Sequence, residues 1–263
     1  MEVRNFVDPH THHFFSNYTT IELLKATGYR AIISLAYFPL QPSSPETLID
    51  LFNWMIEVEP ERFHENRIRY YVGIGIHPRC IPPNYKKCLE HIRKLCNNEL
   101  LVAIGEIGLE TASKIEVKVF KEQLELAMDI DRPVVIHTPR KMKDEILEKT
   151  FNTIDEVEFP HERALIDHLV KHEQVEHVIE EGYYAGLTVQ PGKLDHIDAA
   201  DIVERLRTRY RKMIIDSDCG RDPSKPTAVA ECAKYLLERK LPKRIIKYIC
   251  AKNAIELFKL PIL

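Results

Sequence analysis

The sequence predicts a single (β/α)8 barrel, the TIM-barrel class of α/β protein, with its active site at the carboxyl ends of the strands. Short apolar runs rich in β-branched residues alternate with longer segments of helical periodicity, which is typical of βα units and a parallel sheet. We count eight such runs, the number of strands that closes a barrel. Residue types that bind metals recur at the ends of these runs, where barrel enzymes build their active sites.

The predicted strands are nearly continuous hydrophobic runs, as expected when both faces of a sheet are buried. They are Asn5–His10, Ala31–Phe38, Tyr70–His77, Leu101–Leu109, Pro133–Thr138, Arg163–His168, Tyr184–Val189 and Lys212–Asp218. The helices predicted between and after them include Ser113–Asp131, Asp195–Tyr210, Lys225–Lys240 and Pro242–Leu260. An open doubly wound sheet would show the same alternation, so the residues at the strand ends have to decide between the two folds.

The composition limits the class of protein. The chain has 263 residues, of which 44% are hydrophobic, and its 37 Lys and Arg against 40 Asp and Glu give a net charge of −3. This balance excludes intrinsic disorder, and it argues against a protein that wraps duplex nucleic acid with clustered cations. The length is compatible with one domain or two. Ligands that come from the first to the eighth strand can meet only in one closed barrel, so we expect one domain over residues 1–263.

The amino terminus and the cysteines indicate the compartment. The first residues, MEVRNFVDPH, have neither the apolar core of a signal peptide nor the pattern of a transit peptide. The longest apolar stretch, Ala31–Leu40, is too short to span a membrane. The six cysteines form no C-x-x-C pair and are expected to be reduced thiols. We therefore expect a cytoplasmic protein without membrane contact.

Candidate metal ligands follow the predicted strands. His10 and His12 end the first run, and residues two apart in an extended segment project to the same side, so both can share one ion. Glu106 closes a buried run, where an ionised carboxylate needs a partner or a metal to offset its desolvation. Later runs end in three further candidates, His137, His168 and Asp218. Each histidine alone would more often be a hydrogen-bonded core residue, but their combination on one rim predicts a metal centre.

The order H-x-H, Glu, His, His and Asp resembles the binuclear metal site of the amidohydrolase superfamily. The stretches DPHTHH, GIGIHPR, AIGEIGLE, PVVIHTPR, IIDSD and NAIELF are similar to those of the TatD-related metal-dependent hydrolases and deoxyribonucleases, along nearly the whole chain. That family usually has Gly-Leu-Asp where this chain has Gly108-Leu109-Glu110, and Glu-Thr-Asp where it has Asp216-Ser217-Asp218. These departures indicate a divergent branch with archaeal-type relatives.

Two divalent ions are expected at such a site. We expect His10, His12 and one oxygen of Glu106 to hold the first, with Asp218 nearby. The second ion is expected between the other oxygen of Glu106 and the residues His137 and His168. Only a carboxylate can bridge two cations at the ~3.5–4 Å separation used in two-metal hydrolysis. The donor set suits Zn best, Mn, Ni, Co or Fe(II) next, and Mg least.

The positions of these and neighbouring residues predict their roles in catalysis and substrate binding. Divalent ions lower the pKa of bound water towards neutrality, and Asp218 is expected to orient that water and accept its proton, with Glu106 as the second catalytic residue. Asp216 is expected to lie deeper on the same strand face, where it accepts the far N–H of a ligand histidine or fixes nearby backbone. The residues expected to bind substrate are His77, Arg79 and Arg140, and a surface ion pair is the alternative for each arginine.

The leading functional prediction is a metal-dependent phosphodiesterase, in particular a deoxyribonuclease that acts on the end of single-stranded DNA or on a small phosphoester. The alternative is a hydrolase of C–N or ester bonds in a small molecule, or an aminoacyl-tRNA deacylase, because the fold does not choose the substrate. A third hypothesis is a barrel that retains metal but serves only as an interaction module. No obligate protein partner is implied.

Overall fold

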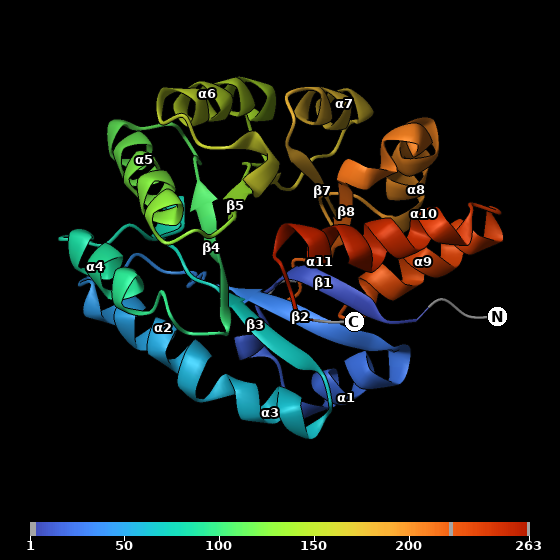
Figure 1. Cartoon of the computed structure of the whole chain (residues 1–263), viewed down its shortest axis with the longest axis horizontal. Coiled ribbons are helices and arrows are strands. Elements are labelled where there is room, and N and C mark those ends of the chain that lie inside the picture. Colours follow the sequence, from blue (N-terminus) through green and yellow to red (C-terminus); the bar gives the residue numbers. More distant parts are fainter. Residues whose placement is uncertain (1–3, 221–222, 262–263) are drawn as a thin grey trace.

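The computed structural model describes residues 4–220 and 223–261 of the chain, and its eight strands form one parallel sheet in the order β1 to β8. The strands curve into a nearly closed barrel with the helices outside it (Figure 1). The strands are β1 Phe6–Thr11, β2 Tyr29–Leu35, β3 Arg69–Gly73, β4 Leu101–Gly108, β5 Val134–His137, β6 Ala164–Ile166, β7 Tyr184–Thr188 and β8 Met213–Asp216. The predicted (β/α)8 barrel is confirmed, and each strand lies within or overlaps its predicted run.

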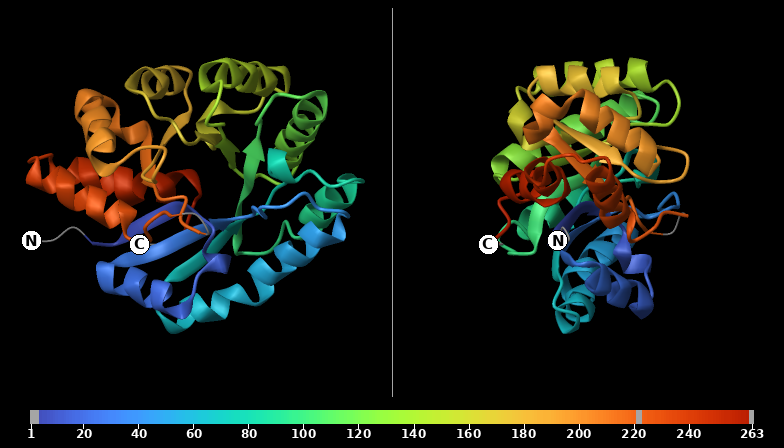
Figure 2. Two further views of the ribbon diagram at one scale, coloured as in Figure 1. Left: turned by 180° about the vertical axis from the view of Figure 1, so that it is seen from behind. Right: turned by 90° about the vertical axis from the view of Figure 1, so that its right-hand side faces the viewer.

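Most helices lie on the outer face of the sheet, as the views from behind and from the side show (Figure 2), whereas Ala254 and Leu257 of the last helix pack against the apolar interior of the barrel. They are α1 Tyr18–Thr27, α2 Glu46–Glu57, α3 Glu59–Glu65, α4 Lys86–Lys94, α5 Lys114–Asp129, α6 Lys143–Glu156, α7 His172–Glu180, α8 His196–Arg205, α9 Ala228–Glu238, α10 Lys243–Lys247 and α11 Asn253–Leu257. In the described part of the chain, no helix combines the length and the apolar character needed to cross a membrane.

The last predicted helix, Pro242–Leu260, is not one regular helix. A π-helical turn over Tyr248–Lys252 separates α10 from α11. The buried amide of Asn253 follows this turn and donates hydrogen bonds to the carbonyl oxygens of Tyr210 (2.7 Å) and Met213 (2.6 Å). These bonds tie the end of the chain to the entrance of β8, a tertiary contact that periodicity alone does not reveal.

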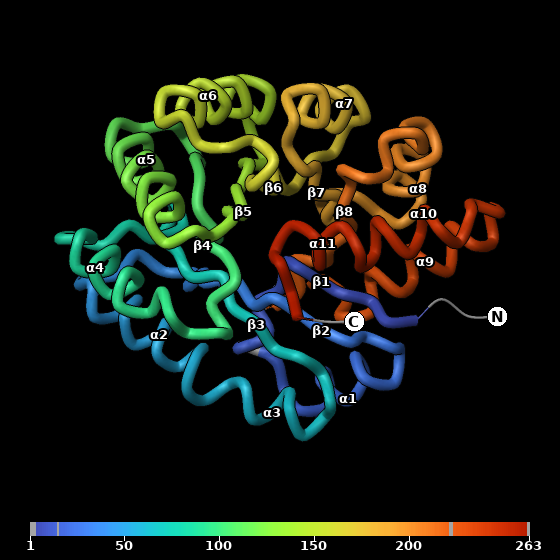
Figure 3. The backbone as a smooth tube through the Cα atoms, in the orientation of Figure 1, coloured from blue at the N-terminus to red at the C-terminus, as the bar shows by residue number. Residues whose placement is uncertain are grey.

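The barrel closes where the first and last strands meet. Thr11 at the end of β1 forms a parallel bridge with Cys219, and the N–H of His12 donates to the carbonyl oxygen of Cys219 (2.6 Å). The trace of the chain runs once around the ring, so the C-terminal helix α11 lies beside β1 (Figure 3). Residues from the first and the last strand are thereby neighbours.

Two apolar layers fill the molecule. One lies between the strands and the surrounding helices and includes Ile32 and Val72. The other lies inside the barrel, where Ala31, Ile33 and Leu35 alternate with the outward residues of β2. Residues of the C-terminal segment, among them Phe258, join this inner layer. The polar site at the carboxyl ends of the strands therefore lies on an apolar floor.

β3 ends earlier than the run Tyr70–His77 predicts. Beyond Gly73, the backbone at Ile76 pairs with the side-chain amide of Gln123 on α5: the Ile76 N–H donates to Oε1 (2.6 Å), and Nε2 donates to the Ile76 carbonyl (3.1 Å). A helix side chain thus replaces a neighbouring strand just before His77. This substitution fixes the segment that delivers His77 to the site.

We predict that Gln123→Leu lowers the free energy of unfolding by about 1–3 kcal/mol, because the buried N–H of Ile76 loses its acceptor. Urea denaturation of the metal-free protein measures the change. Glu125→Gln, an exposed substitution on the same helix, serves as the control and should leave stability unchanged. Equal stability of Gln123→Leu and the wild type would contradict the prediction.

Candidate metal centre

The carboxylate of Glu106, near the end of β4, lies at the centre of the site and is 2% exposed. Five imidazole rings surround it. The distances are 3.4 Å from Oε2 to His10 Nε2, 3.7 Å from Oε2 to His12 Nε2, 2.9 Å from Oε1 to His137 Nδ1, 3.0 Å from Oε1 to His168 Nε2 and 3.8 Å from Oε1 to His77 Nε2. The two carboxylate oxygens of Glu106 therefore face two different groups of histidines.

His10 and His12, which face Oε2 of Glu106, are the histidines expected to hold the first ion. Asp218 joins it, with Oδ1 at 3.0 Å from His12 Nε2 and 3.6 Å from His10 Nε2. The ligand atoms of His10, His12 and Asp218 lie within 4.8 Å of one another, and so do those of His10, Glu106 and His168. The structure thus brings all six predicted ligands together on one rim of the barrel.

Hydrogen bonds at the far ring nitrogen orient three of the histidines. His10 Nδ1 bonds to the carboxylate of Asp167, His12 Nδ1 to the carbonyl oxygen of Leu35 (2.8 Å), and His168 Nδ1 to Oγ1 of Thr188 (2.8 Å). A carbonyl oxygen or a carboxylate can only accept, so Nδ1 carries the hydrogen in His10 and His12. Their Nε2 lone pairs then point at the centre, as is common for metal-binding histidines.

The residues fit divalent cations. The donors are imidazole nitrogens and carboxylate oxygens without a thiolate, a set that suits Zn, Mn, Ni, Co or Fe(II). Among the described residues, the buried Nε2 of His10 has no hydrogen-bond partner. A buried lone pair of this kind is costly unless a cation or a donor satisfies it. The cluster can therefore hold metal.

The charges of the site favour ionised carboxylates. Burial acts to raise the pKa of Glu106, but the interactions with the surrounding histidines, His10 first among them, outweigh it and hold the pKa well below its ordinary value. Burial opposes ionisation of Asp218 too, and the charge of Lys193 holds the pKa of that carboxyl well below its usual range. Both groups are available as anionic ligands.

In His137 the two ring nitrogens exchange the roles that they have in His10 and His12. Its Nδ1 faces Glu106, while its Nε2 lies 2.7 Å from Oε2 of Glu110. This hydrogen bond is the main cause that lowers the pKa of Glu110, so an ionised carboxylate accepts the Nε2 hydrogen and leaves the Nδ1 lone pair for a cation. The sequence showed Glu110 only as a departure from the family motif, and its contact with His137 was not predicted.

His77 differs from the other four histidines. Its Nδ1 accepts a hydrogen bond from the backbone N–H of Arg79 (3.0 Å), so Nε2 carries the hydrogen. Burial is the main cause that holds the pKa of His77 well below its ordinary value, and the ring is neutral. Among the described residues, its Nε2 has no hydrogen-bond partner. His77 thus presents an N–H donor towards the centre, which suits a ligand oxygen better than a metal ion.

The role expected for Asp216 belongs to Asp167. Asp167, and not Asp216, bonds to the far nitrogen of His10. Asp216 is fully buried, and its pKa is raised well above the ordinary value by burial and by the charge of Asp167. Asp216 does lie deep beside the site, as expected, with a carboxylate oxygen within 4.8 Å of ligand atoms of His10 and Asp167. Asp218 itself has a φ of 46° and is outside the extended conformation.

A cavity of about 500 Å³ opens above the centre. The expected substrate residues Arg79 and Arg140 both line it, together with Lys141 and Lys193. Arg79 is exposed, lies over the ring of Tyr37 (5.0 Å) and has Nε at 3.8 Å from Oε2 of Glu110. Nη2 of Arg140 lies 3.4 Å from Oε1 of Gln190. Both arginines are on the expected face, each with a weak partner at the rim.

Lys193 was not among the residues predicted for the site. It lies between β7 and α8, after one of the two predicted strands, Ala31–Phe38 and Tyr184–Val189, for which we expected no site residue. Its Nζ contacts Oδ2 of Asp218 (2.5 Å). The dipeptide Pro191-Gly192 before it marks a turn, but a turn signal does not predict where the following side chain points.

We predict that Glu110→Ala weakens the second cation site about 10- to 100-fold, because His137 loses the carboxylate that orients it. Competition with a chromogenic chelator measures the affinity for each ion. Glu99→Ala, an exposed substitution of the same kind, should bind metal like the wild type. Wild-type affinity of Glu110→Ala at both sites would overturn the role given to this carboxylate.

Known proteins resemble this chain along most of its length. A curated, uncharacterized metal-dependent hydrolase of Methanocaldococcus jannaschii is 35% identical over 215 residues, which cover 81% of this chain and 84% of that protein. The crystal structure of a TatD-like protein from Archaeoglobus fulgidus, 31% identical, has a TM-score of 0.82 and covers 97% of this chain and 100% of its own.

The same fold occurs in more distant proteins. A β-aspartyl dipeptidase from Fervidobacterium islandicum, 16% identical, has a TM-score of 0.68 over 98% of this chain and 76% of its own, a likeness of fold alone. The model of the TatD-related DNase family matches residues 7–259. The chain therefore belongs to the TatD-related DNases, a family of metal-dependent hydrolases.

Proposed function

We propose that this protein is a metal-dependent phosphodiesterase that removes nucleotides from the end of single-stranded DNA or cleaves a small phosphoester. The observation that carries the proposal is the composition of one cavity. Its floor holds the cluster around Glu106, and its wall carries the cations of Arg79, Arg140 and Lys193. A cation-bearing wall beside a metal centre suits a phosphoryl group, and the family assignment favours the same chemistry.

The site residues have definite tasks in this reaction. His10, His12, Glu106 and Asp218 would hold one divalent ion, and His137 and His168 with the other oxygen of Glu106 would hold a second. When bound, the ions supply Lewis-acid stabilisation of the phosphoryl oxygens and a lowered pKa of the attacking water.

Hydrolysis then proceeds by one exchange of bonds at phosphorus. The water oxygen forms a bond to phosphorus while the bond from phosphorus to the leaving nucleoside oxygen breaks. The carboxylate of Asp218 accepts the proton of the water and returns it to the leaving oxygen, so that a diester and water become a monoester and an alcohol. The Nε2–H of His77 donates to a non-bridging phosphoryl oxygen, where negative charge grows.

The net charge of −3 restricts how DNA can bind. A duplex held along the surface would need a broad basic face. A strand end needs only a few cations around one phosphate, and the cavity wall offers that number. We therefore propose that the strand enters end first.

The direct test is cleavage of end-labelled single-stranded DNA by the metal-reconstituted protein. We expect stepwise shortening from one end. We expect Asp218→Asn to lower kcat by about 10²- to 10⁴-fold, because the general base is lost. Glu173→Gln, an exposed carboxylate substitution on α7, should keep full activity.

A substrate panel separates this proposal from the alternatives. Turnover of an amide, a lactone or an aminoacyl-tRNA with no cleavage of DNA or of a phosphodiester would contradict it and favour the other hydrolase classes. No turnover of any substrate at full metal occupancy would favour a barrel that serves only as an interaction module.

A further inference from the structure

The connection after β7 contains a preformed turn, Gln190-Pro191-Gly192-Lys193. The N–H of Lys193 donates to the carbonyl oxygen of Gln190 (2.9 Å), and Gly192 has a φ of +83°. Proline second and a left-handed glycine third are the requirements of a type II turn. A second backbone hydrogen bond flanks the turn, from the N–H of Gln190 to the carbonyl oxygen of Leu194 (3.0 Å). The backbone of Lys193 is therefore fixed without help from a ligand.

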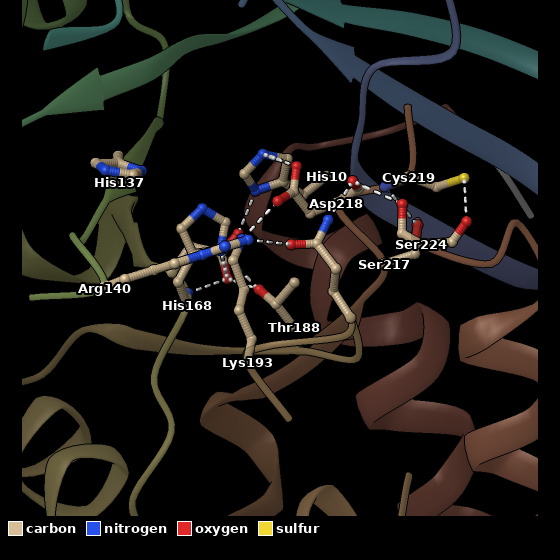
Figure 4. A network of polar contacts seen from close by, with 12 residues as sticks. His10, His137, Arg140, His168, Thr188, Lys193, Ser217, Asp218, Cys219 and Ser224 are labelled. Carbon is tan, nitrogen blue, oxygen red and sulfur yellow. Dashed lines mark hydrogen bonds and ion pairs between the residues drawn. The ribbon is translucent and has the colours of Figure 1, made fainter. Parts of the chain in front are cut away.

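Both ends of this turn contact Asp218. The side chain of Gln190 donates from Nε2 to the Asp218 carbonyl oxygen (2.9 Å), and Lys193 Nζ lies 2.5 Å from Asp218 Oδ2. Figure 4 shows Lys193, His168 and Asp218 converging from three different segments, with Arg140 reaching towards them. The side chain of Lys193 is 7% exposed, and it lines the cavity above the centre.

The ammonium group of Lys193 has more donors than the protein has acceptors for it. Its Nζ is also 2.9 Å from His168 Nδ1. The ammonium group therefore has two partners within hydrogen-bond distance, Asp218 Oδ2 and, in the tautomer that leaves Nδ1 free to accept, His168. Of its three N–H donors, at least one has no acceptor among the described residues.

We propose that Lys193 is a substrate-contacting residue that donates a hydrogen bond to a non-bridging oxygen of the phosphoryl group and so selects anionic over neutral esters. The inference rests on the proposed function and adds to it the residue that recognises the anion. The carboxylates beside Lys193 are metal ligands, so an incoming anion is the remaining acceptor at this wall. Arg140 contacts Gln190 of the same turn, which puts a second cation near the same group.

The test compares Lys193→Met, Lys193→Arg and Lys171→Met in metal-loaded protein. Lys171 is an exposed residue before α7 that pairs with Asp144 (3.0 Å), so its substitution makes the same change of charge outside the cavity. Calorimetric titration with inorganic phosphate gives the affinity without turnover. Metal content and thermal unfolding of each variant show whether the centre and the fold are intact.

We expect Lys193→Met to bind phosphate about tenfold or more weakly, as the loss of one charge-assisted hydrogen bond predicts. Its kcat/KM should fall for bis(p-nitrophenyl) phosphate but not for the neutral ester p-nitrophenyl acetate. Lys193→Arg should recover part of the affinity, and Lys171→Met should match the wild type. Unchanged phosphate affinity in a metal-replete Lys193→Met would overturn the proposal.

The two proposals fail in different ways. If phosphate binding depends on Lys193 but no phosphodiester is cleaved, the proposed function is contradicted and the anion site is supported. Phosphodiester cleavage that does not depend on Lys193 would remove this inference alone. If Lys193→Met does not fold, a crystal structure of the metal-loaded wild type with phosphate decides, because a bound phosphate without contact to Lys193 Nζ would refute the assignment.

Discussion

The burial of one carboxylate organises this protein. Glu106 is almost inaccessible to water, and an isolated ionised carboxylate in such a place is strongly unfavourable. Positive charge must therefore meet it inside the barrel. Imidazoles delivered by four other strand ends surround the carboxylate, and divalent cations held between Glu106 and those imidazoles would supply the charge. Barrel closure between Thr11 and Cys219 brings His10 and His12 within reach of Asp218, so fold and site depend on each other.

Residues that bond to the outer nitrogens of the histidines determine which ring nitrogen faces the centre. Asp167 and Glu110 each accept a hydrogen from a ligand histidine, but they orient opposite ring nitrogens, Nε2 of His10 and Nδ1 of His137. His77 is turned the other way by the backbone N–H of Arg79 and offers a hydrogen in place of a lone pair. One ring of imidazoles thus contains both candidate metal ligands and a hydrogen-bond donor, a division that no residue type reveals by itself.

The sequence was sufficient to predict the eight strands and the clustering of the six candidate ligands, because periodicity reports burial and strand ends meet at one rim. It was insufficient where a side chain from another element decides the geometry. Gln123 ends β3 by taking over the hydrogen bonds of Ile76. Asp167 bonds to the far nitrogen of His10, so the histidine contact expected for Asp216 was wrong. Lys193 reaches the centre only because a turn after β7 points back over the barrel mouth.

The central claim is that Glu106 bridges two divalent cations, and anomalous diffraction from zinc-soaked crystals tests it most directly. The account predicts two peaks about 3.5–4 Å apart, one beside His10 and His12 and one beside His137 and His168, with one oxygen of Glu106 on each ion. A single peak, or two peaks neither of which contacts Glu106, would contradict it.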